Sequence, residues 1–439
     1  MLSAEETALL TRTGPGTPMG DLMRQYWIPA LMSSELPAPD GQPLRVRLLG
    51  ENLVAFRTTS GQVGLLAHAC PHRGASLFYG RNEAEGLRCV YHGWKFDVTG
   101  RCVEMPSEPA ESNFKDKVCS RAYPCRERNG IVFAYMGPRQ ALPPLPDLEP
   151  NLLANEHIDI WTAQRECNWV QALEGDIDTC HFGFLHLGSV APEMVTPDTF
   201  DYYAVNDRTP RYEVVDTDGG TMYGAYRPAG EDTYYWRIAQ FLFPFYTLIP
   251  TGMLGRQIIV RAWVPLDDHH TMFWNLAVPQ TRSRADGTTT SLTRRPFAGS
   301  IRQPEFLPNT SDWLGRWRLK DNALNDYGID REVQRSQSYT GIDGIHLQDQ
   351  AITESMSAIV DRSQEHLGTS DVMVIRTRRR LMRAALDLQD GTIPPGVDHP
   401  EYYRQRSGGI VLPRSADWIA ATAHLRQAFV SHPELVLQT

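Results

Sequence analysis

The sequence predicts an α+β protein in which an all-β domain is followed by a mixed domain built on an antiparallel sheet. Short alternating apolar runs, broken by Gly and Asn, recur over residues 41–145 and are typical of strands. Five prolines between Pro138 and Pro150 can continue neither a helix nor a sheet, so they indicate a domain boundary. Helical and strand-like patterns alternate over 146–439, which favours helices packed on one sheet.

The first 40 residues are expected to form a helical segment. Ser3 and Glu6 have the spacing of a capping box, which opens a helix. No basic stretch followed by an apolar run is found there, so we expect no export signal. The seven cysteines, an odd number, favour thiols or metal ligands over a disulfide framework. We therefore expect a cytoplasmic protein.

Later elements are predicted from local periodicity. A hairpin is expected over 45–57, and polar residues 284–312 are expected to form a long loop. Residues 165–187 have a helical pattern. Four strands and three further helices are predicted, in that order: 221–227, 233–243, 257–266, 271–279, 345–360, 371–389 and 415–430.

Length and charge limit the possible functions. A chain of 439 residues is long enough for two or three domains. The net charge is −9, which argues against nucleic acid or anionic lipid as the main partner, because both bind basic surfaces. No apolar run approaches the roughly 20 residues that cross a bilayer, so no membrane contact is expected.

Two cysteines and two histidines form the first group of candidate ligands. Cys70 and His72 lie two residues apart, and Cys89 and His92 follow with a similar spacing. Each short loop can therefore present one thiolate and one imidazole to the same metal centre. The spacing alone leaves structural zinc open, since zinc also accepts two Cys and two His.

A carboxylate and two histidines form the second group. Asp178, His181 and His186 lie within nine residues, and two His with one carboxylate are the ligands of many non-haem ferrous sites. Five residues correspond to about 140° around a regular helix, so His181 and His186 cannot face one metal unless the helix is distorted. Gly183 lies in that interval and facilitates such a distortion. Asp178 is expected to share a helix face with His181 and to accept a hydrogen bond from its ring.

The two groups together resemble the oxygenase (α) subunit of the Rieske non-haem iron ring-hydroxylating oxygenases. The loops CPHRGASL and CVYHGWKFD are similar to the two cluster-binding loops of Rieske proteins. The stretches RTGPGTPMGDLMRQYWIPAL and EHLGTSD resemble the phthalate 4,5-dioxygenase branch. The resemblance implies a Rieske domain over 41–145 and a helix-grip catalytic domain over 146–439.

The resemblance also implies a role for each candidate ligand. Cys70 and Cys89 would bind one iron of a [2Fe–2S] cluster, and His72 and His92 the other. His181 and His186 would bind a mononuclear Fe(II). The third iron ligand would come from GIHLQDQAITESM, where Asp349 matches the family pattern. The sequence alone would leave Asp343 and Glu354 as competitors.

The same resemblance implies partners and a route for electrons. NADH would reduce a separate flavin and iron–sulfur reductase, which would pass electrons through the cluster to the iron, where O2 is the co-substrate. Head-to-tail assembly as a trimer or as stacked trimers is implied, with Asp178 linking His181 to His92 of the partner subunit. No Rossmann glycine fingerprint is found in the sequence, which also favours a separate reductase.

The expected substrate is a small aromatic carboxylate, with phthalate-type cis-dihydroxylation as the leading reaction. An arginine in an apolar pocket would pair with the carboxylate. Arg237 lies within an aromatic strand and is favoured among the candidates Arg208, Arg211, Arg237, Arg256 and Arg261. A monooxygenase or O-demethylase of the same fold, and a Rieske electron-transfer protein without oxygenase activity, remain open.

Overall fold

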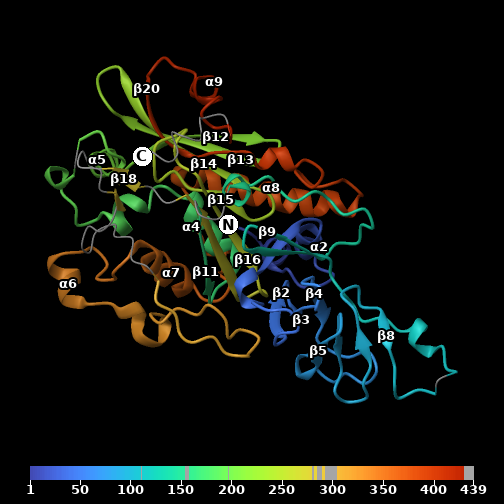
Figure 1. Ribbon diagram of the computed structural model, residues 1–439. Coiled ribbons are helices and arrows are strands. Elements are labelled where there is room, and N and C mark those ends of the chain that lie inside the picture. Colours follow the sequence, from blue (N-terminus) through green and yellow to red (C-terminus); the bar gives the residue numbers. More distant parts are fainter. Residues whose placement is uncertain are drawn as a thin grey trace.

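The computed structural model describes residues 1–109, 111–153, 158–195, 197–278, 281–283, 289–291 and 304–429. It confirms the predicted fold class, an all-β domain followed by an α+β domain with an antiparallel sheet. In Figure 1 the small strands of the first domain (blue to cyan) lie beside the long green and yellow strands of the second.

The N-terminal segment differs in part from the expectation. Helix α1 (Ala4–Thr11) begins where the capping box predicts it, and a second helix, α2 (Pro18–Arg24), follows the turn. The capping box is present: the Ser3 hydroxyl accepts from the Glu6 N–H at 3.1 Å, and the Ser3 N–H donates to the Glu6 carboxylate at 2.8 Å. The expectation that residues 1–40 are helical is corrected by strand β1 (Trp27–Met32), which is buried and pairs with a strand about 100 residues later.

The first domain consists of three small antiparallel sheets. Their strand orders are β1-β10-β9, β2-β3-β4 and β5-β6-β7-β8. The hairpin expected over 45–57 is confirmed as β2 and β3. The strands after β1 are β2 (Leu44–Leu48), β3 (Glu51–Arg57), β4 (Val63–Ala67), β5 (Arg81–Glu83), β6 (Gly86–Arg88), β7 (Lys95–Phe96), β8 (Cys102–Glu104), β9 (Cys125–Arg128) and β10 (Ile131–Tyr135).

One eight-stranded antiparallel sheet organises the second domain. Its order is β11-β17-β16-β15-β14-β13-β12, and β20 also pairs with β14. The four predicted strands are confirmed as β13, β14, β16 and β17, whereas the other four were not predicted. The bounds are β11 (Asp159–Arg165), β12 (Arg211–Thr217), β13 (Gly220–Pro228), β14 (Thr233–Leu242), β15 (Tyr246–Leu248), β16 (Ile259–Pro265), β17 (Thr271–Ala277) and β20 (Gly408–Pro413).

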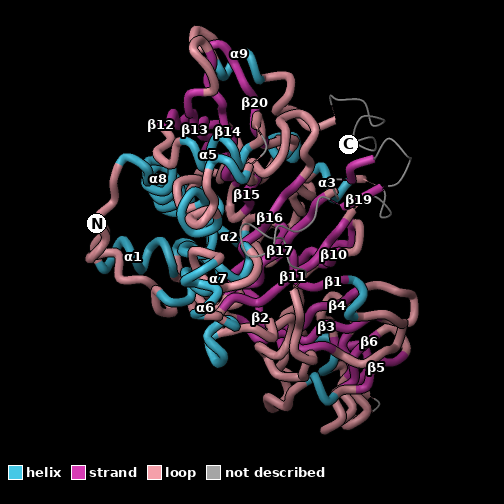
Figure 2. The backbone as a smooth tube through the Cα atoms, turned by 90° about the vertical axis from the view of Figure 1, so that its left-hand side faces the viewer, coloured by secondary structure: helices cyan, strands magenta, loops and turns pink. Residues whose placement is uncertain are grey.

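Helices pack on one another and on strands of this sheet. Helix α4 (Trp169–Ile177) contacts β14 to β16, α7 (Ile345–Ser355) packs on α4, and α8 (Val372–Gln389) packs on β12 and β13. Figure 2 shows α1, α2, α7 and α8 on the left of strands β11, β16 and β17. The shorter helices are α3 (Glu149–Leu152), α5 (Phe200–Asn206), α6 (Arg331–Ser336) and α9 (Trp418–Thr422). Within the described ranges, no helix has the length and apolarity needed to span a bilayer.

The loop expected over 284–312 contains a short strand. Strands β18 (Thr281–Ser283) and β19 (Thr289–Ser291) form a two-stranded hairpin, which corrects that expectation at β19. Residues 284–288 and 292–303 of the expected loop lie outside the described residues. Residues 304–322 are irregular apart from an isolated bridge between Phe306 and Leu319.

The two domains share backbone contacts. The N–H groups of Leu49 and Gly50 donate to the carbonyls of Pro265 and Leu266, at 3.1 and 2.8 Å. The side chains of Arg47 and Asp267 form an ion pair at 2.6 Å beside these bonds. The β2–β3 turn is therefore fixed against the turn that joins β16 and β17.

Candidate active site

A π-helical turn brings His181 and His186 to one side of the chain. Helix α4 ends at Ile177, and residues Phe182–His186 then form a π-helical turn in which the Leu187 N–H donates to the Phe182 carbonyl at 3.2 Å. A π turn bonds residues five apart, so it aligns positions that a regular α-helix would separate. This is the distortion that the sequence required between the two histidines.

Asp349 from α7 completes a group of three candidate ligands. Its Oδ1 lies 3.1 Å from His186 Nε2 and 3.6 Å from His181 Nε2. Candidate ligand atoms of the three residues all lie within 4.8 Å of one another. The competing carboxylates lie elsewhere: Asp343 lines a separate cavity, and Glu354 accepts from the Tyr327 hydroxyl at 2.6 Å. Two imidazoles and one carboxylate fit a non-haem ferrous ion.

In both imidazole rings the nitrogen that faces away from Asp349, Nδ1, has a hydrogen-bond partner. His181 Nδ1 lies 3.2 Å from Asp178 Oδ2, and His186 Nδ1 lies 2.6 Å from Gln348 Oε1. Gln348 donates through its amide nitrogen to the Ile342 carbonyl at 2.9 Å, so its oxygen faces His186. Each Nδ1 therefore carries the proton, and each Nε2 is left free to bind a metal.

The pairing of Asp178 with His181 is local but does not occur on a helix. Asp178 follows the last residue of α4 and has an extended backbone, which corrects the expectation of a shared helix face. Its Oδ1 accepts from the Cys180 N–H at 2.6 Å. A tight turn, in place of a helical turn, thus brings the carboxylate to the His181 ring.

The carboxylates of this site are held in the charged form. Burial alone would raise the pKa of Asp349, but the imidazoles of His186 and His181 outweigh it and hold that pKa well below its usual range. Burial likewise opposes ionisation of Asp178, and hydrogen bonds from the His181 ring and from backbone N–H groups lower its pKa overall. The site therefore offers negative charge to a cation.

The loops with Cys70 and Cys89 have the same backbone structure. In each, the Cys N–H donates to the carbonyl five residues later (2.8 Å), and the N–H four residues later donates back to the Cys carbonyl (2.8 and 2.9 Å). That later residue is Gly74 or Gly93, with φ of 77° and 79°, which glycine adopts without strain. Two equivalent loops thus present one cysteine each.

The four residues of these loops fit a cluster with two thiolate and two imidazole ligands. Cys70 and Cys89 are buried, and the rings of His72 and His92 lie 4.4 Å apart between centroids. Among the described residues, His92 Nδ1 is buried and has no hydrogen-bond partner, which fits a nitrogen that binds a metal. Trp94 stacks on the His72 ring at 4.3 Å and restrains it.

Comparison with known proteins identifies both halves of the chain. Residues 26–121 match the family described as "Rieske [2Fe-2S] domain", and residues 134–434 match "LigXa C-terminal domain like". The chain is 48% identical over 417 residues to the 3-chlorobenzoate-3,4-dioxygenase oxygenase subunit of Comamonas testosteroni, which covers 94% of this chain and 96% of that protein. The chain belongs to the Rieske non-haem iron ring-hydroxylating oxygenases.

Other proteins that are similar to this Rieske oxygenase are named for different reactions. The phthalate 4,5-dioxygenase oxygenase subunit of Pseudomonas putida is 40% identical over 89% of this chain and 88% of its own length. The 5,5'-dehydrodivanillate O-demethylase oxygenase subunit of Sphingobium sp. (strain NBRC 103272 / SYK-6) is 47% identical over 90% and 84%. The solved structure of dicamba monooxygenase bound to dicamba has a TM-score of 0.55 at 18% identity, over 84% of this chain and 99% of that one, which shows the shared fold.

Family membership confirms the predicted cofactors. As the oxygenase subunit of a Rieske aromatic-ring dioxygenase system, the protein uses a Rieske [2Fe–2S] cluster, a mononuclear iron and O2. Subunits of this family work with a separate reductase or ferredoxin and a small aromatic substrate. NADH is the usual electron source of such systems.

The five candidate arginines of the Rieske oxygenase differ in environment. Arg211 and Arg256 are exposed. Arg261 pairs with Asp176 at 2.5 Å, and Arg208 donates to the carbonyls of Gly183, Leu187 and Val190, so it holds the π-helical turn.

Arg237 is the candidate that lies buried beside the candidate metal ligands. It is only 3% exposed, and it donates to the Thr179 hydroxyl and, at 3.1 Å, to the Pro250 carbonyl. Its guanidinium carbon lies 3.7 Å from the Phe200 ring centroid. Thr179 is two residues before His181, so this positive charge lies close to the candidate iron site.

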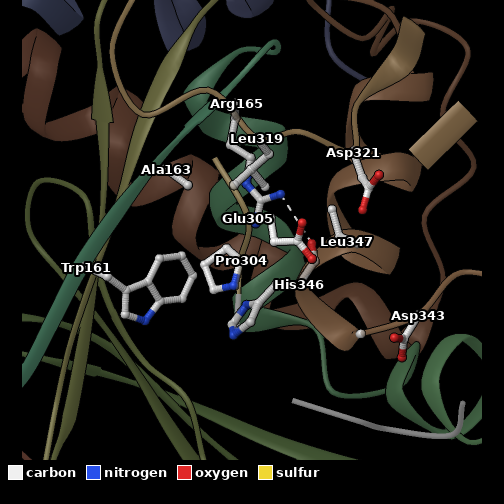
Figure 3. Close-up of a pocket in the computed structure, with 11 residues that line it drawn as sticks. Trp161, Ala163, Arg165, Pro304, Glu305, Leu319, Asp321, Asp343, His346 and Leu347 are labelled. Carbon is white, nitrogen blue, oxygen red and sulfur yellow. Dashed lines mark hydrogen bonds between the residues drawn. The ribbon is translucent and has the colours of Figure 1, made fainter. Parts of the chain in front are cut away.

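A small cavity opens at α7, one turn before Asp349 (Figure 3). Trp161 and Arg165 from β11 and His346 from α7 line it, and Arg165 donates to the His346 carbonyl at 3.2 Å. The cavity measures about 20 Å³. That volume holds a water molecule, whereas ligand pockets usually measure about 300–1,000 Å³. In this conformation the cavity cannot hold an aromatic acid.

Replacing Gln348 with alanine is expected to weaken iron binding roughly 10- to 100-fold. The variant removes the acceptor that fixes the His186 ring, but it leaves all three candidate ligands in place. Titration of the iron-depleted protein with Fe(II) would measure the affinity. Gln350→Ala on the same helix is the matched control, because Gln350 contacts Arg165 and neither histidine. Equal iron affinities in the two variants would contradict the prediction.

Proposed function

We propose that this chain is the terminal oxygenase that hydroxylates an aromatic carboxylate, with His181, His186 and Asp349 as the ligands of its iron. The observation that carries the proposal is the grouping of candidate ligand atoms from these three residues within 4.8 Å. We propose Cys70 and Cys89 as the ligands of one iron of the cluster. His72 and His92 are the proposed ligands of the other iron. When bound, the cluster supplies single electrons and the mononuclear iron activates O2.

We propose a structural or binding role for each polar side chain around the candidate iron ligands. Asp178 and Gln348 fix the two imidazole rings with Nε2 directed at Asp349. Arg208 keeps the π-helical turn closed, which preserves the spacing of the ligands. Arg237 supplies a buried positive charge near His181 for an anionic substrate.

We further propose that the active enzyme is a head-to-tail oligomer, a trimer or stacked trimers. The side chain of Asp178 is 26% exposed although it contacts His181, so it can also reach a neighbouring chain. Asp178 would then link His181 to His92 of the partner subunit. The half-exposed position of His92 on its own domain supports such a contact.

The aromatic carboxylate is proposed from the relatives and from Arg237. Two relatives, a 3-chlorobenzoate dioxygenase and a phthalate dioxygenase, have aromatic acids in their names. We propose cis-dihydroxylation of such an acid, phthalate or a halobenzoate. O-demethylation of an aryl ether is the second candidate, because the O-demethylase relative is 47% identical.

Oxygen uptake with defined products would test this proposal. The purified oxygenase, a flavin and iron–sulfur reductase and NADH are combined with phthalate, 3-chlorobenzoate and a methoxylated aromatic acid. We expect uptake of O2 and a product that has gained two hydroxyl groups from one of the first two acids. Formaldehyde release from the methoxylated acid alone would favour the O-demethylase. If the reductase reduces the protein but none of the mixtures takes up O2, both the dihydroxylation and the O-demethylation proposals are contradicted.

A further inference from the structure

Four polar side chains surround Ala225 on the inner face of the sheet. Tyr212 on β12 and Arg237 on β14 are the direct partners of Ala225 across the two adjacent strand pairs. Tyr223 and Arg227 lie two residues before and after it on β13. Side chains two apart on a strand point to the same face, so all four lie around the small alanine. We call these four residues the Ala225 cluster.

Much of the hydrogen-bonding capacity of this cluster is unused. Arg227 is 1% exposed and its Nε donates to the Asp207 carbonyl at 2.6 Å. Among the described residues, its Nη1 and Nη2 have no partner, and neither do the hydroxyls of Tyr212 and Tyr223. A buried donor without an acceptor costs free energy and is uncommon in folded proteins. The cluster therefore lacks a partner that accepts hydrogen bonds.

The two arginines of the cluster are also without a direct ion pair among the described residues, although Asp207 and Asp201 act on them from a distance. Within the described part of the chain, no carboxylate lies within 4 Å of Arg227 or Arg237. Burial, with a smaller contribution from the charge of Arg237, lowers the pKa of Arg227 to about 10. Buried charges are normally paired with an opposite charge. The missing partner is thus expected to be an anion.

The geometry of the free donors favours a carboxylate as the missing partner. The two terminal nitrogens of Arg227 carry four N–H bonds, and two tyrosine hydroxyls are also free; a carboxylate accepts about four hydrogen bonds and can engage most of these donors. A planar guanidinium also pairs with a carboxylate through two parallel bonds. A metal cation is disfavoured by the positive charge of the two arginines.

The cluster lies against the segment that carries the first histidine ligand. Arg237 donates to Thr179, and Tyr212, Tyr223 and Arg227 lie close enough to Asp178 or Cys180 to interact with them electrostatically. Arg237 also interacts electrostatically with His181. A ligand held on this face of the sheet would therefore have its other end near the iron ligands.

We propose that Arg227, together with Tyr212, Tyr223 and Arg237, binds the carboxylate group of the aromatic substrate. This inference rests on the proposed function and extends it, because Arg227 becomes the residue that selects acids over neutral aromatic compounds. Arg227 is a binding residue in this account and does not take part in the chemistry. The cavity beside α7 is too small for this role.

Thermal unfolding of the holoenzyme with benzoate and with the neutral analogue benzamide would test the inference. In the wild type, benzoate should raise Tm in a concentration-dependent way and benzamide should not. Arg227→Met should weaken benzoate binding roughly 10- to 100-fold. Without ligand, Arg227→Met should be at least as stable as the wild type, because the variant removes an unpaired buried charge. A purely structural arginine would instead lower Tm when replaced.

Two further variants keep the test decisive. Tyr223→Phe removes one hydroxyl with little change of shape and should weaken benzoate binding roughly tenfold. If Arg227→Met fails to fold, the Tyr223→Phe variant still measures the contribution of the cluster to benzoate binding. Arg211→Met, on the exposed face of the adjacent strand, is the matched control and should bind benzoate as the wild type does.

The outcomes separate this inference from the proposed function. If the wild type oxygenates an aromatic acid and both Arg227→Met and Tyr223→Phe bind benzoate normally, the carboxylate site is wrong and the proposed function stands. If benzoate shifts Tm through Arg227 but no aromatic acid supports O2 uptake, the anion site stands and the proposed function is wrong. Equal Tm shifts by benzoate and benzamide would overturn the inference.

Discussion

Replacing Asp349 with alanine is expected to lower hydroxylation by more than about 100-fold and to leave the Rieske cluster intact. A residue that merely orients a metal ligand contributes about 10- to 100-fold, so loss of a ligand should cost more. The carboxylate of Asp349 lies 3.1 Å from His186 Nε2, at the centre of the candidate site. Iron analysis should show the loss of one iron, while the visible spectrum of the cluster remains unchanged.

Asp343→Ala provides the matched control for this prediction. Asp343 is also an aspartate of the α7 region, and the sequence alone could not distinguish it from Asp349. It lines the small cavity and lies outside the group of three ligands. We expect its variant to retain the iron and most of the activity. The ligand assignment would be overturned if Asp349→Ala hydroxylated normally, or if Asp343→Ala lost the iron.

Asp178→Asn is expected to retain both metal centres and to slow coupled turnover by at least about 100-fold. The amide keeps the size of the side chain, but it removes the charge and one of the two acceptor oxygens. Both oxygens are used, since one lies 3.2 Å from His181 Nδ1 and the other accepts from Cys180. The proposed link to His92 of the partner subunit would also lose its ionised acceptor.

Rapid mixing would separate this effect from a loss of metal. The reduced, iron-loaded variant is mixed with O2 and an aromatic acid, and the oxidation of the cluster is followed by its absorbance. We expect slow cluster oxidation at full iron content. Asp176→Asn on the preceding turn serves as a comparison for stability, because Asp176 is bonded to Arg261, Trp263 and Thr247 instead of a histidine. Cluster oxidation at the wild-type rate in Asp178→Asn would refute the proposed role.

Local sequence patterns predicted much of the fold. The long strands β13, β14, β16 and β17 are continuous apolar or alternating runs, so their patterns were readable. Strand β20 is short, begins with two glycines and pairs with β14 more than 160 residues away, so no local signal marks it. Strand β1 was hidden in the same way, because its pairing with β10 depends on the tertiary fold.

The candidate site was predictable to a similar extent. His181 and His186 could be read from their spacing, and the need for a distortion between them followed from helix geometry. Asp349 could be chosen over Asp343 and Glu354 only through the family resemblance, since its meeting with the histidines depends on the packing of α7 on α4. Gln348 and Arg227 were missed. Both faces of β13 are buried, so its alternation carries no sign that the Arg227 side chain points inward.

Because of the π-helical turn, the segment between His181 and His186 should tolerate the deletion of one residue but not the insertion of one. Deleting one residue would give the spacing at which an ordinary α-helix already aligns two side chains. Inserting one would turn the second imidazole a further 100° or so around the axis, away from its counterpart. Relatives that differ in this loop should therefore have lost residues there and should not have gained them.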